Sequence, residues 1–141
     1  MSPWIHEDEP FTLIPEGYIG FVYRITNIKT NKQYLGRKLF RFTRTRKVKG
    51  KTRRVKKIID SDWQEYFGSN ALLQEEVKVL EPSLFKREIL HLCKTKGEMN
   101  YLEAKEIFKV DAIISPEYYN ESIQVRVHRS HLKNLLTENI L

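Results

Sequence analysis

The sequence predicts a small α/β domain, in which helices flank a three-stranded sheet that is mixed or antiparallel. Two observations lead to this prediction: short segments with alternating apolar and polar residues, and one long segment with apolar residues at helical spacing. The chain has 141 residues, 40% of them hydrophobic, which suffices for one core but not for two full domains. We therefore expect a single domain over residues 1–141.

Three segments alternate as strands do. Residues 18–26 place apolar side chains on one face, and a polar turn at 27–32 leads into a second strand at 33–36. These two strands form a predicted hairpin. Residues 85–92 alternate again and predict the third strand, and 123–127 predict a further short strand.

Helices are expected around this sheet. The clearest begins at Gly97, and its apolar stripe would pack on the sheet. Glu103 lies at the edge of that stripe on a helical wheel, so we expect it to be neither fully exposed nor fully buried. Shorter helices are predicted over 61–67, over 70–80 and from Ser130. The stripe consists of Tyr101, Ala104, Phe108 and Ala112.

The positive charge is concentrated in one segment. The net charge is +7, but residues 37–57 contain twelve Lys or Arg and no acidic residue, whereas the remainder has 13 basic and 18 acidic residues. This distribution is typical of nucleic-acid binding, with a solvated localisation arm as the alternative. The segment is predicted to form a second, exposed hairpin; a partly ordered loop is the alternative. The expected DNA contacts are Arg41, Arg46, Lys47, Lys49, Lys51, Arg53, Arg54, Lys56 and Lys57.

Several classes of protein are excluded. A single cysteine, Cys93, allows no internal disulfide, no Cys or His cluster has zinc spacing, and neither a Walker loop nor a dinucleotide-binding glycine pattern occurs. Any metal would therefore bind oxygen ligands. No apolar run approaches the roughly 20 residues of a membrane helix, and the acidic start does not suit a secretion signal. We expect a cytoplasmic protein with no membrane partner.

Two tyrosines fall on one face of the predicted hairpin. Residue numbers of opposite parity share a face when the hairpin loop has an even length, and Tyr23 and Tyr34 meet this condition. Two phenols would therefore converge there. Cross-strand tyrosines also occur simply as packing pairs, and this remains the alternative.

The spacing of these tyrosines resembles a known motif. Phe21-Val22-Tyr23, ten intervening residues and Tyr34-Leu35-Gly36 resemble the paired motif of the GIY-YIG nuclease superfamily. The resemblance covers about 18–127, with a basic insertion at about 37–59. Within the superfamily, three further segments most resemble the Seg-type freestanding phage homing endonucleases. These segments are Trp63 to Ser69, Phe85 to Leu90 and Tyr118 to Glu121.

The resemblance implies a role for each matching residue. Tyr23 and Tyr34 would flank the attacked phosphate, one of them helping to deprotonate the water. Glu103, in the segment that is similar to the family's metal-binding helix, would hold Mg²⁺ or Mn²⁺. Asn120 matches the family's late asparagine and would orient and support the hairpin.

The cations depart from the family pattern. Where the family often has a lysine, three residues after the second tyrosine, the chain has Arg37, followed by Lys38. The family arginine corresponds by count to Arg44, but the basic segment interrupts the helix that should bear it, so Arg53 or Arg54 are alternatives. Tyr66 is the expected substitute for the family's His or Tyr beyond that arginine, since the count gives Val48 there.

We therefore expect a metal-dependent DNA endonuclease of phage or mobile-element type that hydrolyses phosphodiester bonds. Its expected substrate is double-stranded DNA. The rival hypothesis is a nucleic-acid-binding protein that keeps the fold while its site has decayed. A protein-interaction module with a basic localisation arm is a third class. The sequence leaves the target site, single- or double-strand cleavage and the oligomeric state open.

Overall fold

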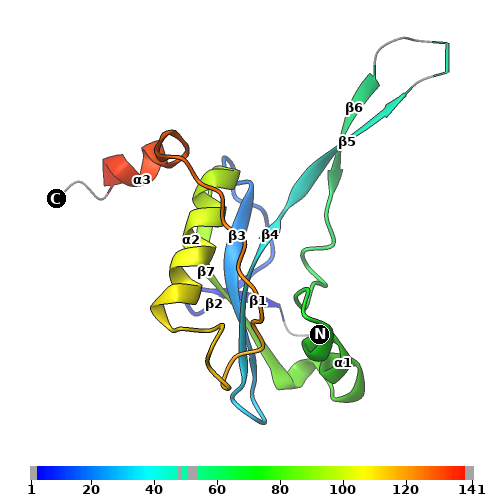
Figure 1. Cartoon of the computed structure of the whole chain (residues 1–141). Helices are drawn as coiled ribbons and strands as arrows, with labels where there is room; N and C mark the ends of the chain where they lie inside the picture. Colours follow the sequence, from blue (N-terminus) through cyan, green and yellow to red (C-terminus); the bar gives the residue numbers. More distant parts are fainter. Residues whose placement is uncertain (1–2, 48, 51–53, 139–141) are drawn as a thin grey trace.

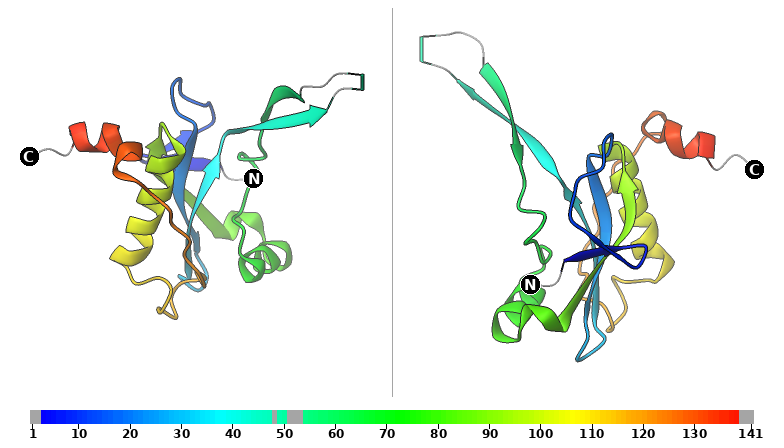
Figure 2. Two further views of the ribbon diagram at one scale, coloured as in Figure 1. Left: turned by 45° about the horizontal axis from the view of Figure 1, so that its top comes forward. Right: turned by 180° about the vertical axis from the view of Figure 1, so that it is seen from behind.

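The computed structural model describes residues 3–47, 49–50 and 54–138. A five-stranded mixed sheet lies between helices, and a two-stranded arm projects away from it (Figures 1 and 2). This architecture confirms the expected α/β class. The elements are β1 Trp4–His6, β2 Glu9–Phe11, β3 Gly20–Asn27, β4 Gln33–Leu39, β5 Arg41–Lys47, β6 Arg54–Asp60, α1 Ala71–Val79, β7 Phe85–Cys93, α2 Lys96–Lys109 and α3 Lys133–Glu138, with 3₁₀ turns at Pro82–Leu84 and Arg129–Leu132.

The large sheet has the strand order β2-β1-β7-β3-β4. Its centre consists of the three predicted strands, with β3 antiparallel to both β4 and β7. β1 and β2 were not predicted, and they extend the sheet to five strands, with β1 parallel to β7. Each has only three residues, which is too short for an alternating pattern to show.

One face of the sheet carries an aromatic core. Trp4 packs edge-on against the Phe21 and Tyr23 rings, with centroids 4.9 and 5.1 Å away. Such contacts add stability beyond the buried area. The chain between β6 and β7, including α1, covers this face (Figure 1). The buried members are Trp4, Phe21, Tyr23, Ile25, Phe40, Trp63, Leu73, Phe85, Ile89 and Tyr119.

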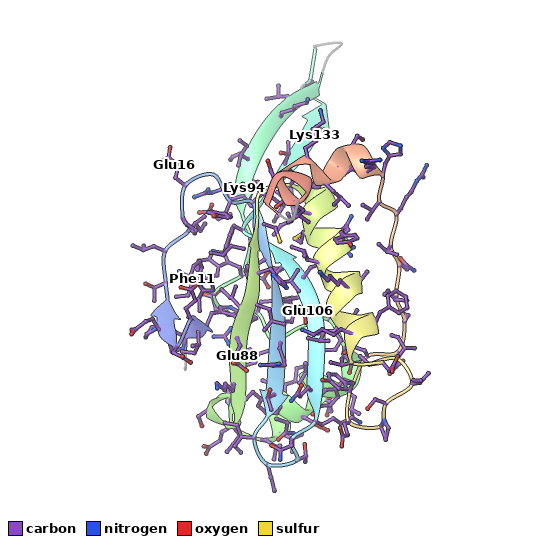
Figure 3. The ribbon with its side chains drawn as sticks, turned by 90° about the vertical axis from the view of Figure 1, so that its left-hand side faces the viewer. Phe11, Glu16, Glu88, Lys94, Glu106 and Lys133 are labelled. Atoms are coloured by element: carbon purple, nitrogen blue, oxygen red, sulfur yellow. The ribbon has the colours of Figure 1, made fainter. Side chains whose placement is uncertain are left out.

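The opposite face is aliphatic and is covered by α2, which Figure 3 shows lying along the sheet. Met99, Leu102 and Ile107 point inward and are at most 8% exposed. The predicted stripe is confirmed for Ala104 and Ala112, which are buried, and is wrong for Tyr101 and Phe108, which are 39% and 62% exposed. The helix has apolar residues on two faces, and the aliphatic one fits the flat surface of β3 and β4.

The segment after β6 also differs from the prediction. Residues 61–67 form turns instead of a helix, and the Ser61 hydroxyl, expected to cap that helix, donates to the Leu39 carbonyl at 2.6 Å. Trp63 is buried in the aromatic core, and its carbonyl accepts a hydrogen bond from the Trp4 indole at 2.6 Å. These long-range contacts hold the segment flat against the core and override its helical pattern.

The remaining predictions are mostly confirmed. The basic segment forms the exposed hairpin of β5 and β6, and the helix over 70–80 and the last helix are both present. Residues 123–127, predicted as a short strand, are extended but pair with no strand among the described residues. No described helix has the length and apolar character needed to span a membrane.

The close approach of the Tyr23 ring to Gly36 can be tested by adding a methyl group at residue 36. A Cβ on Gly36 would lie 2.6 Å from Cζ of Tyr23 and would also overlap its hydroxyl. Gly36→Ala should therefore lower the free energy of unfolding by about 1–3 kcal/mol, the usual cost of overpacking, measured by urea denaturation. In a Tyr23→Ala background the same change should cost much less; equal costs in both backgrounds would refute the contact.

Candidate active site

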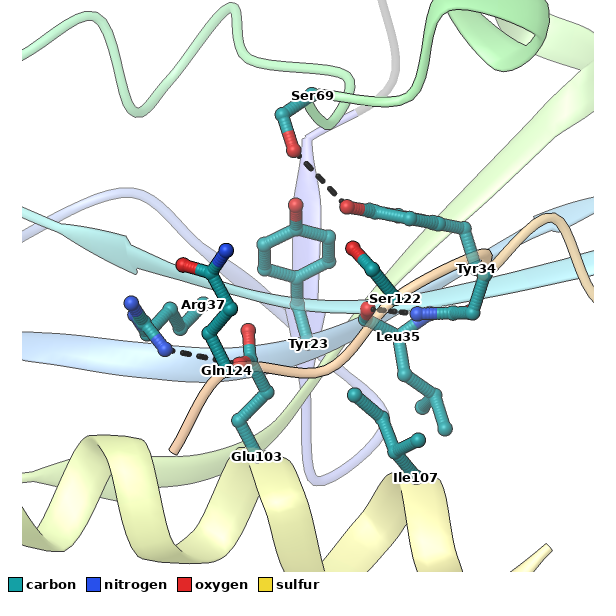
Figure 4. Close-up of a pocket in the computed structure, with 10 residues that line it drawn as sticks. Tyr23, Tyr34, Leu35, Arg37, Ser69, Glu103, Ile107, Ser122 and Gln124 are labelled. Atoms are coloured by element: carbon teal, nitrogen blue, oxygen red, sulfur yellow. Dashed lines mark hydrogen bonds and ion pairs between the residues drawn. The ribbon is translucent and has the colours of Figure 1, made fainter. Parts of the chain in front are cut away.

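A polar pocket of about 340 Å³ opens at the free edge of β4, where residues from both faces of the sheet meet (Figure 4). β4 is the last strand of the sheet, so none of the other strands that the structure describes pairs with its outer edge. The pocket brings together five of the predicted site residues. Its lining is Tyr23, Tyr34, Leu35, Arg37, Ser69, Glu103, Ile107, Asn120, Ser122 and Gln124.

The two tyrosines reach this edge in different ways. Tyr23 pairs with Gly36 and Tyr34 with Ile25, so the tyrosines are diagonal neighbours on one face, with ring centroids 6.2 Å apart. The predicted shared face is thus confirmed. The Tyr23 ring crosses the glycine of the adjacent strand, while the Tyr34 hydroxyl is hydrogen-bonded to Ser69 Oγ at 2.9 Å.

Both tyrosines are neutral phenols at neutral pH. Burial raises the pKa of Tyr23 well above its ordinary value, and the nearby Tyr66 and Tyr34 hydroxyls raise it further. Burial also raises the pKa of Tyr34, against a lowering effect of the bond with Ser69. Each hydroxyl is therefore available as both a donor and an acceptor.

Glu103 projects from α2 toward the pocket and pairs with Arg37 of β4. Arg37 Nη1 lies 2.9 Å from Glu103 Oε1, and the carboxylate side chain is only 14% exposed. Burial raises the pKa of Glu103, and the guanidinium beside it counteracts this shift. The intermediate burial expected from the helical wheel is confirmed.

Asn120 completes the sheet edge beside the pocket. Its side chain accepts from Leu35 N at 3.0 Å and donates to Leu35 O at 2.8 Å. Just before it, Tyr119 N donates to Gln33 O at 2.8 Å, so the chain at 117–120 runs along β4 like a short extra strand. This segment provides hydrogen-bond partners for the backbone groups of the β4 edge as far as Leu35. The pocket opens beyond that residue.

Lys38 and Tyr66 lie behind the pocket. The Tyr66 ring packs edge-on against Tyr23, with centroids 6.0 Å apart. Lys38 Nζ sits 3.9 Å from the centre of the Tyr66 ring and 2.7 Å from Asp62 Oδ1. Its hydrogen bond to Asp62 lowers the pKa of that carboxyl. Tyr66 is thus placed to support Tyr23, and Lys38 to hold Tyr66.

Arg44 is not brought to the pocket. It lies on β5 in the arm, exposed, with its guanidinium 5.2 Å from the Phe42 ring. Arg41, Lys49, Lys56 and Lys57 are also on the arm and exposed. Among the other predicted DNA contacts, Lys51 and Arg53 lie outside the described residues, as does Val48. Arg46, Lys47 and Arg54 are placed by the backbone of β5 and β6 only.

Arg87 anchors the segment that bears Tyr66 and Ser69. It lies within the Phe85 to Leu90 motif, but no role was predicted for it. It is 2% exposed and lies between the rings of Trp4 and Phe67, at 4.7 and 4.3 Å from their centres. Its Nη1 donates to the carbonyls of Gln64 and Tyr66, each at 2.9 Å. Burial lowers its pKa to about 10.

Ser69, Ser122 and Gln124 also line the pocket without having been predicted. Ser69 follows Gly68, whose φ of +86° turns the chain so that the serine meets Tyr34. The position of Ser69, directly after a glycine and at the end of the Trp63 to Ser69 motif, could have indicated a site residue from the sequence. Ser122 and Gln124 lie in the extended chain after Asn120, and no pattern in the sequence distinguishes them.

The pocket fits a hydrated divalent ion. Within the described ranges, no group of three His, Cys, Asp or Glu side chains is arranged as a metal site. Mg²⁺ commonly keeps several waters and uses one or two carboxylates with substrate phosphates. A single half-buried carboxylate on the wall of an open polar pocket, as Glu103 provides, matches that mode of binding.

With these two tyrosines at one end of a sheet and a carboxylate on the facing helix, the fold is that of a GIY-YIG nuclease domain. Residues 4–123 match the family model described as “Putative endonuclease segE, GIY-YIG domain”, so the chain belongs to this family of endonucleases. The match begins in β1, consistent with the N-terminal strands being part of the sheet. DNA is the substrate of such an endonuclease, and GIY-YIG nucleases generally use divalent metals. No curated protein and no solved structure matches the chain.

Removing the Arg87 anchor should destabilise the protein. Arg87→Met removes the donor of two part-buried carbonyls and the buried guanidinium between two rings, and we expect a loss of about 2–4 kcal/mol in the free energy of unfolding, measured with urea. Arg24→Met is the matched control, because Arg24 is on the adjacent strand but half-exposed, paired with Glu88 at 3.2 Å. That control should cost less than about 1 kcal/mol. Similar losses in both variants would contradict the anchoring role.

Proposed function

We propose that the protein is a divalent-metal-dependent endonuclease, of phage or mobile-element origin and of the homing type, that hydrolyses phosphodiester bonds in double-stranded DNA. The main support is the pocket, where two phenols, a guanidinium and a carboxylate meet at an open sheet edge. The family match and the resemblance to Seg-type endonucleases support the origin.

Glu103 would hold Mg²⁺ or Mn²⁺, whose charge stabilises the negative charge that develops on the phosphate and the leaving group. Arg37 already contacts this carboxylate with one nitrogen. A guanidinium has five N–H donors, so Arg37 has further donors for a phosphate oxygen. Its half-exposed position in the pocket supports Arg37 as the catalytic cation, in preference to the distant Arg44.

The tyrosines would flank the attacked phosphate. A neutral phenol can accept a hydrogen bond from the attacking water and donate its own proton to a phosphate oxygen. One of the two hydroxyls would take the proton of the water and pass its own proton to a phosphate oxygen, as the P–O bond to the water forms and the P–O bond to the leaving group breaks. Ser69 would orient the Tyr34 hydroxyl, Tyr66 would support Tyr23, and Asn120 would fix the position of β4.

The arm would bind the duplex outside the cleavage site. Its cations are too numerous to surround one phosphate, so most would contact phosphates along the DNA backbone. Such contacts contribute affinity that falls with salt. Affinity and chemistry would therefore reside in different parts of the protein.

Glu103→Gln is the central test. This change removes the anionic ligand and little volume, so plasmid cleavage in Mg²⁺ or Mn²⁺ should fall by about 10³-fold while DNA binding persists. Glu106→Gln is the matched control on the same helix, since Glu106 binds His91 at 2.9 Å outside the pocket. Cleavage by Glu103→Gln at the wild-type rate would refute the metal site. Binding by the wild type without any cleavage would favour the decayed, binding-only protein.

The tyrosines can be tested by removing only their hydroxyls. Tyr23→Phe and Tyr34→Phe should each slow cleavage at saturating DNA and metal by about 10²–10⁴-fold, with unfolding temperatures near that of the wild type. Tyr101→Phe, on the exposed face of α2, is the control and should cut normally. Normal rates in both pocket variants would show that the pair only packs.

The arm should affect salt dependence more than the rate. Replacing Lys49, Lys56 and Lys57 by Gln should flatten the slope of log affinity against log salt by about 2–3 units, with a small effect on the saturated rate. The control replaces three exposed body lysines, Lys78, Lys105 and Lys109. An unchanged slope would indicate that the arm does not bind DNA.

Arg44→Gln, tested separately, should leave the saturated rate nearly intact.

A further inference from the structure

The arm of β5 and β6 exposes both of its faces. Figures 1 and 2 show it projecting away from the five-stranded sheet. Its strands pair over seven residues each, from Arg41 with Asp60 to Lys47 with Arg54, and are therefore roughly 20 Å long. A two-stranded ribbon is marginally stable in water, so a partner along one face would stabilise it. The exposed side chains include Thr43, Arg44, Thr45, Val55, Lys56, Lys57 and Ile58.

The pairing within the arm favours a polyanionic partner. Arg44 lies directly opposite Lys57, and like charges at opposed positions of two strands destabilise the pairing. Residues 41–60 contain one acidic residue, Asp60 at the base, whose Oδ1 lies 2.9 Å from Arg41 Nε. Phosphates on either side of the arm would remove the repulsion along the rest of its length.

The two faces of the arm differ in character. Arg44 and Lys57 lie on one face, together with Phe42 and Ile59, which are half-buried at the base. The other face has two threonines and an isoleucine near its middle, with one lysine beside them: Thr43 pairs with Ile58, and Thr45 with Lys56. Ile58 is 71% exposed in the midst of a basic segment. Contact with solvent or with phosphate gives no reason for an isoleucine there.

The dimensions of the arm favour one groove of the duplex. The major groove of B-DNA is about 12 Å wide and admits a two-stranded ribbon, whereas the minor groove is about 6 Å wide and takes a ribbon only when the DNA is deformed to widen it. Threonine side chains contact base edges, and apolar groups contact the thymine methyl, only when the backbone that bears them lies close to the groove floor. Arginine and lysine are long enough to reach the groove walls.

We propose that the arm lies in the major groove of the substrate duplex, with the face of Thr43, Thr45 and Ile58 against the base edges, and that this contact selects where the protein cuts. The inference rests on the proposed function, because it takes duplex DNA as the substrate. Arg44 and Lys57 would then contact phosphates of the groove walls. Cleavage preference would thus arise in the arm and not in the pocket.

Dimethyl sulfate distinguishes the grooves, because it methylates guanine N7 in the major groove and adenine N3 in the minor groove. The probe is a labelled plasmid fragment that spans a cleavage site mapped with the wild-type protein, bound by the full-length Glu103→Gln variant. We expect protection of guanine N7 over about five to seven base pairs next to the cut, with adenine N3 still reactive. Protection of adenine N3, or of neither atom on a bound fragment, would overturn the proposal.

The threonines test selection directly. Thr43→Val with Thr45→Val keeps shape and charge but removes two hydroxyls, and should reduce the preference for the mapped site over other plasmid sites by about tenfold. The salt slope should not change. Thr26→Val, the same substitution on β3, is the control. An unchanged pattern of cuts would overturn the proposal, whereas a wild type that never cuts would refute the proposed function instead.

Discussion

The position of the Tyr23 ring depends on the absence of a side chain at Gly36, and the rest of the site is built around that contact. Tyr23 is 1% exposed and belongs to the aromatic core, yet it lines a pocket at the sheet edge, because its ring can lie across a residue that has no Cβ. The core thereby fixes the direction of the Tyr23 hydroxyl, for which we propose a role in catalysis. The alternative, a tyrosine on a surface loop, would have to be ordered each time substrate binds, at a cost in conformational entropy.

The pocket also depends on how the edge of β4 is managed. An exposed strand edge offers unpaired N–H and C=O groups to other chains, and proteins usually cover such edges. Here residues 117–119 and the Asn120 amide cover it as far as Leu35. The remaining edge, at Arg37, lines the pocket. The same asparagine therefore covers part of the strand edge and marks where the pocket begins.

The sequence predicted what local patterns determine: the hairpin, the shared face of its tyrosines, and the half-burial of Glu103. It failed where distant residues decide. Nothing near Trp63 indicates that Trp4 and Arg87 hold its segment flat, so a helix was expected there. On α2, one face carries Tyr101 and Phe108 and another carries aliphatic residues, and the sequence pattern does not distinguish which of them is buried. Contact with the sheet buries the aliphatic face. Arg44 was predicted by counting ten residues from Tyr34. Because the arm begins at Arg41, within that count, Arg44 lies on the arm and not at the pocket.

The base of that arm is closed independently of its length. Ser61 N donates to Phe40 O at 2.8 Å, and the Ser61 hydroxyl donates to Leu39 O, so the chain enters and leaves the arm at one point. Phe40 and Trp63, on either side of this point, are in contact within the core. The body is therefore complete without β5 and β6. A change in the length or sequence of the arm therefore requires no repacking of the core.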